Sequence, residues 1–127
     1  MRSLPLLILL GACAANPSQG ESRAQRDLVE ELAGRTAGPA ERCVPARGGQ
    51  SLQIVDQRTL VYRSGPTVFV NTLDAACPGL RPDNILVAEV HGSQYCRGDR
   101  VRGLERQGGI PGPSCVLRDF VPYRRAG

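Results

Sequence analysis

Cysteines constrain the fold of this 127-residue chain more than any other residue type. Cys13 follows a short apolar run at the start, whereas the other four are spread over the rest of the chain: Cys43, Cys77, Cys96 and Cys115. An even number of cysteines in an exported chain predicts a framework of disulfides. In the reducing cytosol the same residues would remain thiols. The fold therefore depends first on whether the chain is exported.

The first thirteen residues, MRSLPLLILLGAC, have the composition of an export signal. Arg2 supplies a positive charge, and the apolar run from Leu4 to Leu10 is interrupted only by Pro5. A charged start followed by a short apolar run is typical of a signal peptide. The run is much shorter than the roughly 20 apolar residues that a membrane-spanning helix needs. We therefore expect residues 1–12 to be a cleaved signal peptide.

The end of this run, Leu10-Gly11-Ala12-Cys13, resembles the lipobox of bacterial lipoproteins. The resemblance implies that the chain is cut before Cys13 and that acyl chains, palmitate among them, are attached to this cysteine. Because each buried CH₂ contributes about 0.8 kcal/mol, several acyl chains on one residue would hold the protein at a membrane. Ala14 in place of an aspartate implies the outer membrane, with the protein facing the periplasm. The alternative is cleavage by an ordinary signal peptidase, which would leave a soluble periplasmic protein.

If Cys13 carries lipid, four cysteines remain, and the oxidising periplasm would join them in two disulfides. The even number of remaining cysteines supports the lipobox interpretation independently, because all four can pair and no thiol is left over. Four cysteines allow three pairings, and the sequence does not choose between them. Our working expectation is Cys43–Cys115 with Cys77–Cys96.

Residues 13–42 are expected to be a lipidated tether that contains one short helix, over about residues 22–34. Ser22 and Gln25 have the spacing of a capping box, and Gly34 is a fitting stop. About three helical turns are marginal in isolation, so the sequence leaves open whether this helix packs on a domain or frays. Residues 34–42 have the composition of a linker.

From Cys43 onward the apolar period changes to two, which predicts strands. Residues 85–90 (ILVAEV) are the most apolar of these, and we expect them to form a central strand. The expected domain over residues 43–127 is all-β, a small five- or six-stranded antiparallel barrel-like sheet whose strand order is compatible with an OB fold. The expected strands are residues 51–55, 59–63, 67–73, 85–90, 99–104 and 115–121.

Four short motifs stand in order along this domain: IVDQRTLV at residues 54–61, CPGL at 77–80, CRGD at 96–99, and Cys115 followed by Phe120. Together they resemble an uncharacterised family, a domain of unknown function in small four-cysteine proteins secreted by proteobacteria. The resemblance implies an exported domain with two disulfides, and it supplies no activity.

Arginines in the second half of the chain are the candidate binding residues. All sixteen basic side chains are arginine, and the net charge is +4. Arginine suits bidentate contacts to phosphate or carboxylate, so Arg97, Arg100, Arg102 and Arg118 would form an anion-binding patch if the strands gathered them. The simpler interpretation is a solvated surface. The excess charge is too small, and aromatic residues are too few, to predict nucleic-acid binding.

No motif in the sequence specifies a reaction. His91, the single histidine, lies two residues before Ser93, but no nucleophile elbow surrounds them, and we expect a surface histidine. One histidine and four disulfide-bonded cysteines leave too few ligands for a metal site, and no cofactor is expected.

We therefore expect a non-enzymatic binding or interaction module of the cell envelope. Its expected partners are the membrane, through the lipid, and an envelope protein or an anionic envelope component. The first alternative is an inhibitor or accessory subunit of an envelope enzyme or secretion complex. A small hydrolase using His91 ranks last.

The lipid prediction is tested by Cys13→Ala, which removes the sulfur atom through which the lipid would be attached. We expect the variant to move from the membrane fraction to the soluble periplasmic fraction when cells are fractionated and blotted. A variant that stayed with the membranes would show the lipobox interpretation to be wrong.

Overall fold

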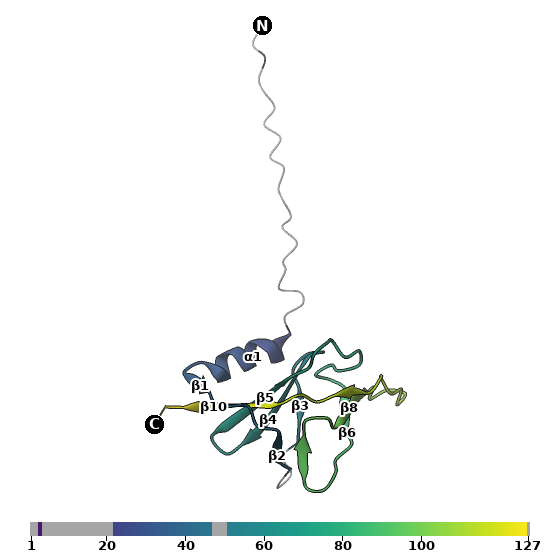
Figure 1. Cartoon of the computed structure of the whole chain (residues 1–127). Helices are drawn as coiled ribbons and strands as arrows, with labels where there is room; N and C mark the ends of the chain where they lie inside the picture. Colours follow the sequence, from purple (N-terminus) through teal and green to yellow (C-terminus); the bar gives the residue numbers. More distant parts are fainter. Residues whose placement is uncertain (1–2, 4–21, 47–50, 127) are drawn as a thin grey trace.

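The computed structural model describes residue 3, residues 22–46 and residues 51–126. Apart from residue 3, the expected signal peptide lies outside the described residues, as does Cys13, so their roles stay predictions. Figure 1 shows the helix lying along one side of the sheets, with β6 and β8 grouped away from the C-terminus. The elements are α1 (Arg23–Leu32), β1 (Arg35–Ala37), β2 (Cys43–Pro45), β3 (Gln53–Ile54), β4 (Thr59–Ser64), β5 (Thr67–Thr72), β6 (Ile85–Ala88), β7 (Gln94–Cys96), β8 (Arg100–Leu104), β9 (Cys115–Val116) and β10 (Phe120–Arg125).

The strands form three antiparallel sheets, so the predicted all-β class with one short helix is confirmed. The largest sheet has the order β1-β10-β5-β4-β3, a second has β6-β8-β9, and β2 pairs with β7. The sheets do not close into a barrel, because β3 and β6 are terminal strands that pair on one side only.

Strands β4 and β5 are buried on both faces, which divides the core into two clusters. Leu60 and Tyr62 face the two smaller sheets and pack with Leu80, Leu117 and Phe120. On the opposite face, the intervening Val61 packs with its neighbours under α1. This alternation follows from the two-residue period of a strand.

The helix packs on the sheet, which settles the alternative that the sequence left open. Its capping box is formed as predicted, with Gln25 N donating to Ser22 Oγ and Ser22 N donating to Gln25 Oε1. Leu28 is buried against the valines of the sheet. Arg63 of β4 holds Glu31 through two bonds, of 2.6 and 2.7 Å. The helix is therefore part of the domain.

The prediction that residues 34–42 form a linker is wrong, because part of this segment also belongs to the folded domain. Arg35–Ala37 forms β1, which pairs with β10 at the edge of the main sheet, and Glu41 bridges to Phe120. The domain consequently begins at the helix and not at Cys43. The short polar sequence gave no periodic signal because β1 is only three residues long.

The disulfides are Cys43–Cys96 and Cys77–Cys115, so the expected pairing of Cys43 with Cys115 and of Cys77 with Cys96 is wrong. The reason is strand register: β2 pairs antiparallel with β7, and this places Cys43 opposite Cys96. Cys77, in the loop after β5, is thereby left to join β9.

The expectation that residues 85–90 form a central strand is also wrong. Ile85–Ala88 forms β6, an edge strand, and β8 occupies the centre of that sheet. Ile85 and Val90 are 41% and 38% exposed, although they belong to the most apolar stretch of the domain. This apolar edge borders the groove described below.

Glycines allow the loop after β5 to touch both β8 and the loop that precedes β9. A Cβ on Gly103 would lie 1.8 Å from the carbonyl oxygen of Gly79, and a Cβ on Gly112 would lie 2.9 Å from that of Pro78. Both distances are shorter than a carbon and an oxygen tolerate, so only glycine fits.

Gly103→Ala should therefore destabilise the domain, by about 3 kcal/mol, because its methyl group must push backbone atoms apart. Urea unfolding measures the effect. The neighbouring Arg102→Ala, at a half-buried position, serves as the control and should stay within about 0.5 kcal/mol of the parent. Equal stabilities of the two variants would contradict the close backbone contact.

The contribution of the Arg63–Glu31 ion pair to the free energy of unfolding depends on pH. The hydrogen bond from Arg63 lowers the pKa of Glu31, and partial burial opposes this only in part. Because the pKa of Glu31 is lower in the folded state, the ionised carboxylate stabilises the fold at pH values above the pKa of the unfolded state, about 4.3. This stabilisation is lost as the pH falls through the pKa of the folded state. Both side chains are partly exposed, so the contribution is at most about 1 kcal/mol.

Glu31→Gln should accordingly lower the free energy of unfolding by up to about 1 kcal/mol at pH 7 and by nothing measurable near pH 3. Urea titrations at the two pH values measure this, with the exposed Glu30→Gln as the control. A Glu31 effect of the same size at both pH values would show that the charge is not responsible.

Candidate binding groove

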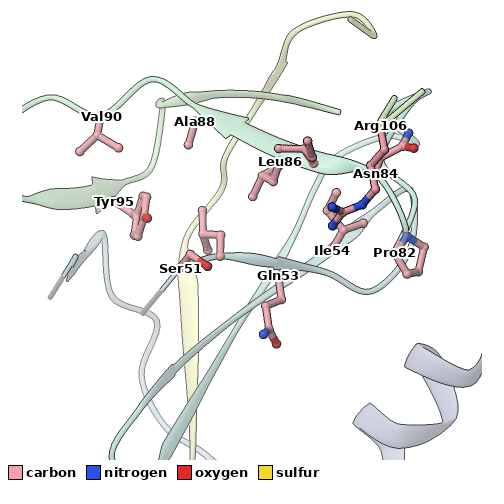
Figure 2. Close-up of a pocket in the computed structure, with 12 residues that line it drawn as sticks. Ser51, Gln53, Ile54, Pro82, Asn84, Leu86, Ala88, Val90, Tyr95 and Arg106 are labelled. Carbon is pink, nitrogen blue, oxygen red and sulfur yellow. The ribbon is translucent and has the colours of Figure 1, made fainter. Parts of the chain in front are cut away.

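A groove lies between the two unpaired edges, β3 on one side and β6 on the other. Its volume is about 600 Å³, within the range of about 300–1,000 Å³ that is common for ligand sites. Figure 2 shows β6 passing above the groove and the segment from Ser51 to Ile54, which ends in β3, passing below it. The site is thus formed where the main sheet and the three-stranded sheet fail to join.

Apolar side chains from both strands form the floor of the groove. Leu52 and Ile54 are 4% and 8% exposed and belong to the core cluster. Leu86 and Ala88 line the groove from β6 and pack against the same cluster. The floor is therefore the outer surface of the hydrophobic core, and its shape is fixed by core packing.

On the β3 side, backbone polar groups that face away from β4 belong to residues that line the groove. Val55 N donates to Thr59 O over 2.9 Å, so Val55 directs its backbone toward β4. Because hydrogen-bonding direction alternates along a strand, Gln53 also faces β4, whereas Leu52 and Ile54 face away from it. Leu52 and Ile54 have no backbone hydrogen-bond partner on that side among the described residues.

The same alternation holds on β6. Glu89 N donates to Arg100 O over 2.9 Å, which directs Glu89 and Val87 toward β8. Leu86 and Ala88 consequently present their N–H and C=O groups away from β8. Within residues 22–46 and 51–126 these groups also lack a backbone partner. Both sides of the groove therefore carry free donors and acceptors at every second residue.

The two ends of the groove differ in chemistry. At one end, Arg106 donates through Nε to Asp83 O over 2.7 Å, and in the described part of the chain its two terminal nitrogens have no partner. Figure 2 shows its guanidinium beside Asn84 and Ile54. At the other end lie Val90 and Tyr95, and Tyr95 packs edge-on against Tyr62 with ring centroids 5.7 Å apart. One end is thus cationic and the other aromatic.

The four arginines predicted to bind anions are placed differently from one another. Arg97 pairs with Asp119 at 3.0 Å, and Arg118 pairs with Asp74 at 3.1 Å. Arg100 and Arg102 occupy alternate positions of β8, which places them on one face of the strand. No carboxylate pairs with either of these two in the described part of the chain. A patch of four free arginines is not formed, and anion binding by Arg100 and Arg102 stays a prediction.

His91 is exposed in the turn after β6. Ser93 takes part in the fold through its backbone, since its carbonyl accepts from Ala46 N over 2.8 Å. Within the described ranges, no group of three or more His, Cys, Asp or Glu side chains is arranged to hold a metal ion.

Sequence reasoning missed the groove itself. Its signal was present in ILVAEV, which has too much apolar surface for an ordinary edge strand. That composition predicts a central strand, because periodicity does not distinguish burial within a sheet from exposure at the edge of a groove.

Comparison of the chain with protein-family models, with curated proteins and with solved structures gives no match. Among the described residues, no helix is both long and apolar enough to span a membrane.

Proposed function

We propose that this protein is a non-enzymatic binding module of the bacterial cell envelope, and that its partner occupies the groove between β3 and β6. The observation that carries the proposal is the groove, an open cavity with an apolar floor and unpaired backbone groups on both sides. Unpaired strand edges attract other chains, and proteins generally shield them. Two such edges facing one cavity are a suitable binding site.

The groove is also held in a fixed shape, which favours binding because less order has to be imposed on association. The Cys43–Cys96 disulfide joins β2 to β7, and β7 carries Tyr95 at the aromatic end. The Cys77–Cys115 disulfide joins the loop after β5 to β9. Cross-links of this kind are typical of proteins in oxidising compartments, which agrees with export to the periplasm.

In this proposal, lipid on Cys13 holds the domain at the outer membrane, facing the periplasm, and residues 14–21 connect the lipid to α1. A soluble periplasmic protein is the alternative. The second candidate function is that of an inhibitor or accessory subunit of an envelope enzyme or secretion complex. The same groove supports it, because such a subunit must also bind a protein partner.

Photo-crosslinking in living cells tests the proposal. A photoreactive amino acid in place of Val90 stands at the aromatic end of the groove, whereas the same amino acid in place of Val116 stands on the far edge of the three-stranded sheet. Both positions are exposed, at 38% and 52%. We expect a discrete adduct with an envelope component from position 90 only, detected by a mobility shift and mass spectrometry.

Adducts of equal yield from both positions would mean that the groove has no special role. The absence of adducts from position 90 would overturn the proposal that the groove is occupied in the envelope.

A further inference from the structure

We propose that the occupant of the groove is an extended peptide segment of a protein partner, which adds as a strand between β3 and β6 and places a carboxylate at Arg106. This inference rests on the proposed function of the groove and specifies its ligand.

The backbone of both sides carries the argument. Leu52 and Ile54, in and just before β3, and Leu86 and Ala88 on β6 direct free N–H and C=O groups away from β4 and β8, and all four residues line the groove. An extended peptide offers complementary groups on both of its sides at the same two-residue interval. One added strand would therefore satisfy both edges together. A purely apolar ligand would cover these polar groups without pairing them, which is unfavourable.

The floor predicts the side chains of such a peptide. Successive residues of a strand point to opposite faces, so every second side chain of the bound segment would rest on the core surface between Ile54 and Leu86. These side chains should be apolar, and one should be large enough to reach Tyr95. The intervening side chains would face solvent and should be polar. The recognised segment therefore alternates apolar and polar residues.

Arg106 predicts how one end of the segment is recognised. Its Nε is engaged with Asp83 O, which orients the guanidinium, and its two terminal nitrogens have no partner among the described residues. A carboxylate accepts both in a bidentate arrangement. The net charge of +4 would favour the approach of an acidic segment. A C-terminal carboxylate and an acidic side chain share this chemistry, and the experiment separates them.

The probe is a display library of random eight-residue peptides with free C-termini, selected on the oxidised mature chain carrying Cys13→Ala. We expect the selected peptides to alternate apolar and polar residues. The best one is then synthesised with a free or an amidated C-terminus, and its affinity is measured by calorimetry. A loss of affinity on amidation assigns the carboxylate to the C-terminus, and equal affinities combined with a shared acidic residue assign it to a side chain.

Amide hydrogen exchange measured by NMR tests whether the peptide adds as a strand. The N–H groups of Leu52, Ile54, Leu86 and Ala88 should exchange at least about tenfold more slowly when the peptide is bound. The N–H of Val87, which already faces β8, should change little and serves as the internal reference. Binding without slower exchange at the four outward amides would overturn strand addition and leave the groove as a site for another binding mode.

Ala88→Pro removes one outward N–H and leaves the β6–β8 ladder intact, because the Ala88 N–H does not face β8. We expect peptide affinity to fall about tenfold. The matched control is Val116→Pro on the outer edge of β9, where Leu117 N donates to Asp99 O and Val116 faces away from β8. This control should bind like the parent, and equal binding by both variants would overturn the proposal.

Arg106→Gln should abolish the preference for the carboxylate and leave the affinity for a neutral form of the peptide unchanged. An unchanged carboxylate preference would overturn the role of Arg106.

Two further outcomes separate this inference from the proposed function. A library that yields no groove-binding peptide, together with a crosslink from position 90 to a non-protein component, would overturn strand addition and retain the binding module. Slower exchange at the four amides that depends on protein concentration alone would identify a second copy of the chain as the occupant and overturn the peptide.

Discussion

Burial of β4 and β5 on both faces is the constraint on which the rest of this fold depends. Leu60 and Tyr62 require cover on one side of the main sheet, and Val61 and Val68 require it on the other. The single helix α1 covers the second side, where Leu28 packs on the valines and the Arg63–Glu31 ion pair attaches the helix to the sheet. The first side is covered by two small sheets whose strands are two to five residues long. Strands so short are weak by themselves, and they need another source of stability.

The disulfides supply that stability to the smaller sheets. Cys43–Cys96 closes a separation of 53 residues and Cys77–Cys115 one of 38, so each contributes about 4 kcal/mol in the chain-entropy account. The Gly79–Gly103 contact adds a second link between the loop after β5 and β8. These links hold the small sheets against the core without any backbone pairing between β3 and β6. The groove is therefore a consequence of joining the layers by cross-links instead of by a continuous ladder.

Local signals predicted the local structure of this chain well. The capping box at Ser22 and the alternation in residues 59–63 and 67–73 gave the helix and two of the three longest strands, β4 and β5, since each depends only on neighbouring residues. The errors all involve distant pairings. The pairing of Arg35 with Arg125 makes β1 a strand, and the pairing of Cys43 with Cys96 determines the disulfides. Neither pairing produces a periodic pattern in the sequence. The groove was not predicted either, because it exists only where two strands that are distant in the sequence remain unpaired.

The position of β6 gives its composition a physical explanation. Edge strands usually carry charges or prolines that discourage pairing, yet Ile85–Ala88 contains neither. Charges occur only just outside the strand, at Asp83 and Glu89. A uniformly apolar edge is a liability in any protein unless pairing there is useful, and the facing edge of β3 has the same outward backbone pattern. Two edges that are open to pairing and border one cavity are therefore the structural basis of the binding role that we propose.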